Sequence, residues 1–280
     1  MHSTENRKSF QVLFGTAANS PPDLIPILRK LFLFEITPEK LFTYQSKRLA
    51  AGVSNSTVNR EVAVLQNMLN MAASWQRIKV NAIRGVKKLK EPPGRLRFLS
   101  LEEIQKLLAC CPPPPHPLRD MVMVALTTGM RRGEILGLRW DYIRLDNRLI
   151  ILPVTKNNTV RVLPINDTLH SLLLEMPDKT GYFFGNGNGG HVENIKHSFT
   201  SACRRAGITD FRFHDLRHTY ASYLTMRGVY IRALQELLGH KTLAMTQRYS
   251  HLAPEQLQNA VKLLDGVIGE KRELIGQPSF

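Results

Sequence analysis

The sequence predicts a mainly α-helical protein with a small antiparallel β-sheet, an α+β fold in two domains. Apolar residues at helical spacing occur both early and late in the chain. Between them, the Ile- and Val-rich stretch NRLIILPVTKNNTVRVLPIN predicts two strands joined as a hairpin at residues 156–158. A length of 280 residues with 43% hydrophobic content suits two ordinary domains. We place these domains at residues 21–84 and 99–280.

The first domain contains two clear helical patterns. In ITPEKLFTYQSKRLAAG, Thr37 can cap a helix, Pro38 suits its first turn, and Gly52 supplies a left-handed stop. The next segment, SNSTVNREVAVLQNMLNMAASW, repeats apolar residues at a 4,3,4,3 spacing from Val58 to Ala72. That spacing places one apolar stripe along a second helix. Residues 1–20 show no period, and we expect them to be poorly ordered.

The second domain opens with a helix and returns to helices after the hairpin. Ser100 and Glu103 have the spacing of a capping box. The loop CPPPPHP then separates this helix from another that begins near Leu118. From Val192 onward the pattern is again helical.

The charge of the chain predicts a polyanionic partner. Lys and Arg number 38 against 23 Asp and Glu, a formal net charge of +15. A membrane is the weaker choice, because no apolar run approaches the roughly 20 residues of a membrane span and the first residues do not form a signal peptide. Three cysteines without a CxxC pair fit a reducing cytoplasm. Nucleic acid is therefore the predicted partner, at a cytoplasmic, nucleoid-associated location.

Two groups of polar residues are candidates for contact with DNA. The outer face of the first domain can enter a major groove, although such a face is often only solvated. The segment RGVKKLKEPPGRLRF gathers Lys and Arg around Pro-Pro-Gly, so we predict a basic linker at residues 85–98. The outward-facing candidates on the helices are Lys47, Arg48, Asn59 and Arg60, and those in the linker are Lys87, Lys88, Lys90, Arg95 and Arg97.

In TTGMRRGEILGLRW, two arginines stand near the start of a helix. The planar guanidinium of Arg131 or Arg132 can grip two phosphate oxygens at once. The alternative is that both are solvated and that Glu134 merely pairs with one of them.

The stretch FRFHDLRHTY concentrates groups that handle protons and phosphates. His214 and Arg217 share a helix face, so one can move a proton while the other holds a phosphate oxygen, and His218 lies close by. A zinc site is the weak alternative, since no third ligand is evident. Farther on, His240 follows a helix that ends at Gly239. Tyr249 is either a nucleophile or a packing aromatic.

In this order, TGMRRGE, TKNNTVRVLP, HDLRHT, LLGH and TQRYSH resemble the catalytic domain of the tyrosine recombinases, or phage integrase family, from about Leu99 to Ala253. The earlier stretch GVSNSTVNREVAVLQNMLNMA resembles the core-binding domain of integrases. The resemblance implies a helical core-binding domain followed by an integrase-type catalytic domain. It also implies a site-specific recombinase that cleaves and rejoins double-stranded DNA through a 3′-phosphotyrosyl intermediate. Such an enzyme integrates or excises a phage or another mobile element.

The resemblance also assigns roles to individual residues and implies a homotetramer in the synaptic complex, with neither cofactor nor metal. Glu134 matches an acidic residue that supports the site. The residues that match catalytic positions are Arg131, Lys156, His214, Arg217, His240 and Tyr249.

The N-terminus departs from the family pattern, because the residues before about position 30 are too few for a separate arm-site domain and the first core-binding helix looks abbreviated. Two other functions remain open. A degenerate integrase would bind DNA without cleaving it, and a metal-dependent nuclease would need clustered carboxylates, which are scattered here. Accessory DNA-bending proteins, the target sequence and the choice between integration and excision are not determined by the sequence.

Overall fold

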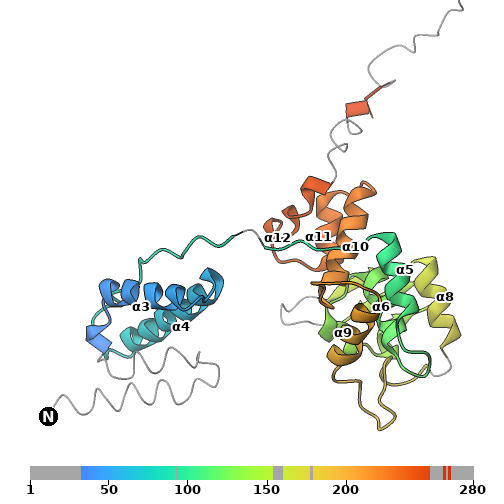
Figure 1. The fold of residues 1–280 in the computed structure, drawn as a ribbon, viewed down its shortest axis with the longest axis horizontal. Helices are drawn as coiled ribbons and strands as arrows, with labels where there is room; N and C mark the ends of the chain where they lie inside the picture. Colours follow the sequence, from blue (N-terminus) through green and yellow to red (C-terminus); the bar gives the residue numbers. More distant parts are fainter. Residues whose placement is uncertain are drawn as a thin grey trace, which may run out of the picture. The chain divides into compact units, whose positions relative to one another are not determined.

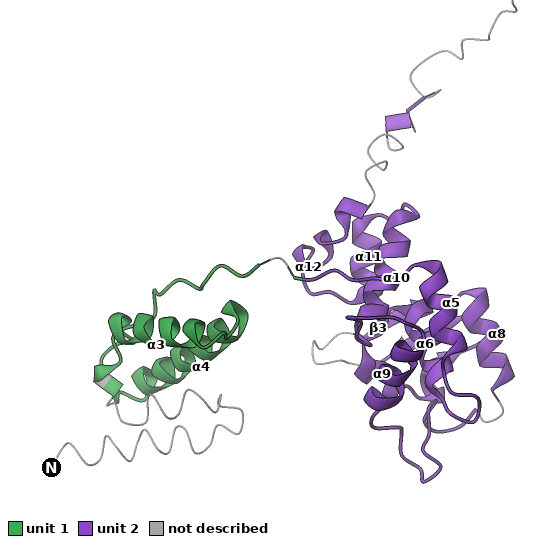
Figure 2. Cartoon of the chain, viewed as in Figure 1, with its two compact units in different colours: residues 1–94 green, residues 95–280 purple. Residues whose placement is uncertain are grey.

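The computed structural model of the protein describes residues 33–92, 94–153, 160–176, 179–252, 261–262 and 264–265. The chain separates into two compact units, divided after Gly94 (Figure 2). Helices are the main secondary structure and the strands form one small antiparallel sheet, which confirms the predicted fold class (Figure 1). Residues 1–20 and Lys156 lie outside the described residues. Within the described ranges, no helix has the length and apolar character needed to cross a membrane.

Two helices form the described part of the first unit. The first, α3 (Pro38–Ala50), begins as predicted, with the Thr37 hydroxyl accepting a backbone hydrogen bond three residues later. The second, α4 (Asn55–Ser74), is capped by Ser54, and the short 3-10 turn η1 (Leu33–Glu35) precedes both helices. The predicted apolar stripe of α4 packs into a core with α3. This core contains Leu33, Ile36, Leu41, Tyr44, Val58, Val62, Leu65, Met68, Leu69, Ala72 and Ile83.

The basic segment after α4, which is the predicted basic linker of residues 85–98, contacts a different unit at each end. Asn59 of α4 donates a hydrogen bond to the carbonyl of Leu89 at 2.9 Å and accepts one from the same residue's N–H at 2.8 Å. Beyond the division, Arg95 forms ion pairs with Asp210 and Asp215 of the second unit. The described part of this segment contains neither helix nor strand. Side-chain contacts rather than regular structure therefore fix its ends.

The second unit is mostly helical. Its first helix begins with the predicted capping box, in which Ser100 and Glu103 each bind the other's backbone. The helices are α5 (Leu101–Ala109), α6 (Leu118–Thr128), α7 (Arg132–Leu136), α8 (Asp167–Glu175), α9 (Lys196–Arg205), α10 (Asp215–Met226), α11 (Ile231–Leu238) and α12 (Ala244–Gln247), and the 3-10 turns are η2 (Trp140–Tyr142) and η3 (Ser250–Leu252).

A three-stranded antiparallel sheet interrupts these helices. Its strands β1 (Ile143–Arg144), β2 (Leu149–Leu152) and β3 (Arg161–Pro164) are neighbours in chain order. Ile150 of β2 faces Leu163 of β3, and both are buried. The predicted hairpin is therefore the β2–β3 pair, whereas the sequence analysis missed the short β1.

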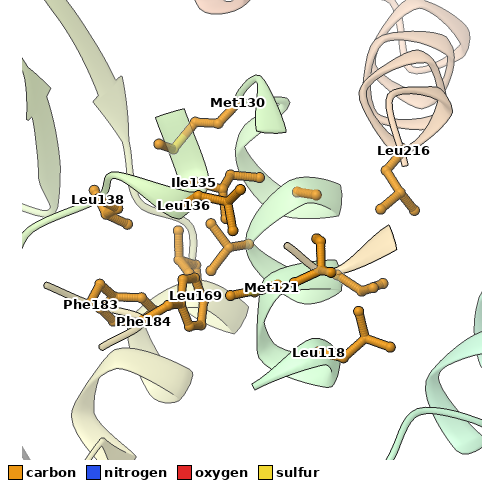
Figure 3. Close-up of a cluster of buried hydrophobic side chains, with 14 of the residues drawn as sticks. Leu118, Met121, Met130, Ile135, Leu136, Leu138, Leu169, Phe183, Phe184 and Leu216 are labelled. Carbon is orange, nitrogen blue, oxygen red and sulfur yellow. The ribbon is translucent and has the colours of Figure 1, made fainter. Parts of the chain in front are cut away.

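The core of the second unit surrounds α6, which packs against α7, α8 and α10. Figure 3 shows apolar side chains from several of these elements around α6. The packing of α10 on α6 is important for the site, because it brings the segment with His214 and Arg217 beside the turn that follows α6. The labelled residues are Leu118, Met121, Met130, Ile135, Leu136, Leu138, Leu169, Phe183, Phe184 and Leu216.

A second, smaller apolar cluster joins the last described helices. Ala221 of α10 packs with Leu234 and Leu238 of α11 and with the ring of Tyr249, which is 1% exposed. Figure 1 shows α10, α11 and α12 grouped together. This cluster places the TQRYSH motif against α10, so that His218 and Tyr249 meet although they are 31 residues apart in the chain.

Candidate active site

Five of the six predicted catalytic residues come together in the second unit. Four of them line one cavity of about 340 Å³: His214, Arg217, His240 and Tyr249. The fifth, Arg131, reaches the turn after α11, where its guanidinium donates to the carbonyl of Gly239 at 3.0 Å. Lys156, the sixth, lies outside the described residues.

Arg131 is held at the N-terminus of α7 by Glu134. The backbone N–H of Arg131 donates to one carboxylate oxygen at 2.7 Å, and its guanidinium donates to the other at 2.9 Å. The side chain of Arg131 keeps 37% of its surface exposed. The pairing with Glu134 that the sequence left open therefore exists. It orients a partly exposed cation rather than leaving it free in solvent.

Arg161 is a buried cation that the sequence analysis did not single out. It donates to Glu134 at 2.7 Å and to the carbonyl of Leu238 at 3.0 Å. Burial by itself raises the pKa of the Glu134 carboxyl, but the charge of Arg161 and the bonds from Arg131 outweigh burial and lower it. The alternation of β3 gave a usable signal, because Arg161 occupies the same inward face as Leu163.

Two glycines allow the close packing behind these arginines. Gly239 ends α11 with φ +60°, and a Cβ there would lie 2.7 Å from Nη1 of Arg161. Gly129 ends α6 with φ +62°, and a Cβ there would lie 2.3 Å from the ring of Tyr220. Burial raises the pKa of Tyr220 to about 12. Tyr220 is thus a packing residue.

Arg217 is almost fully buried, at 3% exposure. Its guanidinium donates to the carbonyl of Gly129 at 2.7 Å and to that of Leu238. Burial, followed by the charges of Arg131 and Arg161, lowers its pKa to about 9. Arg217 therefore stays charged at neutral pH. Two main-chain carbonyls fix its planar fork at the cavity.

His240 follows Gly239 and is oriented by hydrogen bonds. Its Nδ1 lies 2.9 Å from the Thr246 hydroxyl, and its carbonyl accepts from Gln235 at 3.1 Å. Burial, then the charges of Arg217 and other cations, lowers its pKa to about 4. The ring is therefore neutral at neutral pH, with Nε2 as the nitrogen that can bind a ligand.

The hydroxyl of Tyr249 makes a 2.6 Å hydrogen bond with Nδ1 of His218. Burial raises the pKa of Tyr249, and the opposing effects of Arg217 and Arg248 are smaller. His214 lies at the cavity rim, exposed, with its ring 5.2 Å from that of His218.

Arg248 is a second cation that the sequence analysis missed. It is exposed and lines the cavity, and its charge adds to the larger effect of burial in lowering the pKa of His214, His218 and His240. Its position immediately before Tyr249 was the available signal. An exposed guanidinium at the mouth of the cavity can attract an anion without the cost of desolvating it.

The helix residues predicted to contact DNA fall into two classes. Lys47 and Arg60 are exposed, as expected. The expected exposure of Arg48 and Asn59 is wrong. Arg48 binds Glu61 at 2.7 Å with 14% of its side chain exposed, because the Glu61 carboxylate is buried between the helices and needs a partner. Asn59 is 4% exposed, because its amide holds the basic segment.

The linker residues also differ among themselves. Lys87, Lys88 and Lys90 are exposed. Arg95 is exposed but bound to two aspartates, whereas Arg97 is partly buried, pairs with Glu103 and stacks over Phe211 at 5.6 Å. The three lysines are therefore available to bind phosphates, whereas the two arginines are already paired with carboxylates.

No group of three or more His, Cys, Asp and Glu side chains in the described parts of the chain is placed to hold a metal ion. His214 and His218, the pair weighed for zinc, contact each other edge to face instead. The prediction that the protein needs no metal stays a prediction.

The sequence is similar to integrases and recombinases. The profile described as "Phage integrase family" matches residues 97–256, and "Phage integrase, N-terminal domain" matches residues 23–90. A shufflon-specific DNA recombinase of Escherichia coli is 32% identical over 232 residues, which cover 80% of this chain and 60% of that protein. The integrase of Haemophilus phage HP1 is 36% identical over 212 residues, 74% of this chain and 59% of that protein. The chain thus spans about three fifths of the length of these relatives.

Solved structures support the same relationship. The catalytic domain of bacteriophage HP1 integrase is 34% identical and superposes with a TM-score of 0.51. The superposition covers 63% of this chain and 100% of that domain. A lambda integrase dimer bound to a COC′ core site has a TM-score of 0.67 over 87% of this chain and 93% of that chain, and its 17% identity shows a likeness of fold alone. Because the family profile covers more than half of the sequence and the motifs HDLRHT, LLGH and TQRYSH meet around one cavity, this chain belongs to the phage integrase family, the tyrosine recombinases.

Proposed function

We propose that the protein is a site-specific recombinase that cleaves and rejoins double-stranded DNA through a 3′-phosphotyrosyl intermediate. The supporting observation is that Tyr249 lines the same cavity as Arg217 and His240. A phenol can store the energy of the phosphodiester bond in a covalent link, which hydrolysis would lose. Two cations that main-chain carbonyls hold in place, Arg131 and Arg217, suit the charge of a phosphoryl transition state.

The candidate site supplies a separate group for each part of this reaction. The oxygen of Tyr249 attacks the scissile phosphorus. Arg131 and Arg217 neutralise the non-bridging oxygens, and their bonds to main-chain carbonyls hold both cations in position before DNA binds. Nε2 of His240 donates a further hydrogen bond, since Thr246 occupies Nδ1. Glu134 supports the site by holding Arg131.

Lys156 completes the proposal from the sequence alone. We assign to it the proton that the departing 5′-oxygen needs, because an ammonium can lose a proton readily when it enters a site of low polarity. Attack of a 5′-hydroxyl on the phosphotyrosine reverses the step and rejoins a strand.

The proposed substrate is duplex DNA, bound by both units in a homotetrameric synaptic complex. The formal net charge of +15 and the exposed lysines of the basic segment support this. The reaction would integrate or excise a phage or another mobile element, at a cytoplasmic, nucleoid-associated location. A degenerate integrase that only binds DNA remains the alternative function.

The nucleophile can be tested on nicked duplexes tiled from the DNA that flanks the coding region. We expect the wild-type protein to form a covalent adduct on one of them, in the presence of EDTA. Tyr249→Phe removes one oxygen and should abolish the adduct while DNA binding persists. Tyr220→Phe is the matched control and should keep it. Binding without an adduct by the wild-type protein would support the degenerate alternative.

A further inference from the structure

The hydrogen bond between His218 and Tyr249 gives the nucleophile a partner that the family resemblance did not assign. Nδ1 of His218 and the Tyr249 hydroxyl are 2.6 Å apart. Both side chains are buried, at 7% and 1% exposure. The bond joins α10 to the segment after α12, so it forms only when the C-terminal helices pack together.

The proton of this bond belongs to the phenol. A neutral phenol is a better donor than a neutral imidazole, and an imidazole nitrogen is the better acceptor. His218 is neutral at neutral pH because burial, followed by the charges of His214 and Arg248, lowers its pKa to about 4. We therefore assign Nδ1 as the acceptor and Nε2 as the protonated nitrogen.

Tyr249 needs such an acceptor. Burial raises the pKa of its hydroxyl in spite of Arg217 and Arg248, so the free protein contains the neutral phenol. Attack by a neutral phenol would place a positive charge on its oxygen. A base in contact with the hydroxyl removes that charge as the bond to phosphorus forms.

His214 is less suitable than His218 for this step. It is exposed at the cavity rim, and no hydrogen bond of its side chain occurs within the described residues. Its ring meets that of His218 edge to face, with 5.2 Å between centroids. The contact with the Tyr249 hydroxyl is made by His218, whose Nδ1 lies 2.6 Å from it.

We propose that His218 is the base that takes the phenolic proton of Tyr249, an inference that rests on the proposed recombinase function. As the Oη–P bond forms, the bond from phosphorus to the 5′-oxygen breaks and the phenolic proton moves to Nδ1. The leaving oxygen receives a different proton, from Lys156 in the proposed reaction. On rejoining, the 5′-hydroxyl gives its proton to Lys156 and attacks phosphorus, the Oη–P bond breaks, and His218 returns its proton to Oη.

Bound DNA makes His218 a stronger base at the time of reaction. The scissile phosphate brings negative charge into the cavity and stabilises the imidazolium, which the surrounding cations disfavour in the free protein. The charged and titratable groups around His218 are His214 just before α10, Asp215 and Arg217 of α10, His240 after α11, and Arg248 and Tyr249 after α12.

The test compares His218→Asn with His214→Asn in the full chain. Asparagine keeps a polar group near the position of Nδ1 but cannot take a proton. The probe is the nicked duplex selected with the wild-type protein. For His218→Asn we expect unchanged DNA affinity and single-turnover adduct formation slowed at least about 100-fold at neutral pH. Its rate should climb with pH, because ionisation of the phenol replaces the base, while the wild-type rate is flat above neutrality.

The His214→Asn variant should lose rate but keep the wild-type pH profile. If instead His218→Asn matches or exceeds the wild-type rate, His218 is not the base, and the recombinase function still stands. If the wild-type protein forms no adduct on any duplex, the function and this inference fail together.

A second measurement needs neither variant nor DNA. Nitrogen-15 spectra of imidazole-labelled wild-type protein report the tautomer of His218. The proposal requires the proton on Nε2, and a proton on Nδ1 would overturn it, because that nitrogen could then not accept from Tyr249.

Discussion

The buried ion pair between Arg161 and Glu134 should be a major source of stability for the second unit. Arg161→Met keeps the volume of the side chain but removes its charge. The two partners have side-chain exposures of only 9% and 13%, so the variant leaves a buried carboxylate with one ligand fewer. Removing one partner of a buried pair costs about 3–5 kcal/mol. Since Arg131 still binds Glu134 at 2.9 Å, we expect about 3 kcal/mol.

The loss should also depend on pH. In the wild-type protein the lowered pKa of Glu134 means that its contribution to stability is present above the unfolded-state pKa and is lost as pH falls through the folded-state value. Without Arg161, burial dominates and raises this pKa. The charged carboxylate then destabilises the variant at neutral pH, and its protonation removes this destabilisation. The stability difference between the two proteins should therefore shrink between pH 7 and pH 4.

Urea unfolding followed by tryptophan fluorescence measures this difference. Trp140 is buried in the second unit, whereas Trp75 of the first is 55% exposed, so a Trp75→Phe background makes the signal specific. The matched control is Arg148→Met, whose partner is 91% exposed and whose loss should cost less than about 1 kcal/mol. A loss for Arg161→Met no larger than the control, or one that does not change with pH, would refute the reasoning.

Three further predictions follow from single contacts. Gly239→Ala should destabilise the second unit by more than Gly228→Ala in urea unfolding, because both glycines have positive φ but only the first places a Cβ against Arg161. Asn59→Ala should destabilise the first unit by about 1–3 kcal/mol. Native-state hydrogen exchange should show faster exchange of the Leu89 amide, which donates to Asn59 in the wild-type protein. Lys87→Ala should lower the slope of log affinity against log salt by about 1 for duplex DNA, since each phosphate contact contributes about 0.9; an unchanged slope would remove this lysine from the interface.

Local chemistry allowed much of the fold to be predicted. The caps at Thr37 and Ser100 each act on backbone groups within three residues, so neighbouring sequence decides them. Helical apolar spacing likewise identified the stripe from Val58 to Ala72. In contrast, the two-residue strand β1 has too few residues to show a period, and only pairing with β2 defines it.

Residue type alone predicted the wrong exposure for polar side chains that bind buried groups. Arg48 and Asn59 have the character of a solvated face, yet one neutralises the buried Glu61 and the other replaces a missing backbone partner of Leu89. Both partners lie far along the chain, so no local pattern indicates the contact. For Arg161, the strand alternation indicated an inward side chain, but its partner Glu134 lies 27 residues away and no local pattern identifies that contact.

The sequence by itself determined which chemical groups the site contains, because ordered motifs identify Arg131, Arg217, His240 and Tyr249 as a set. Only the tertiary structure decided how those groups stand toward one another. Packing of the C-terminal helices buries Tyr249 and sets its hydroxyl against His218 rather than His214. The proton affinity of each group depends on the charges and the burial around it, and both come from segments distant in the chain.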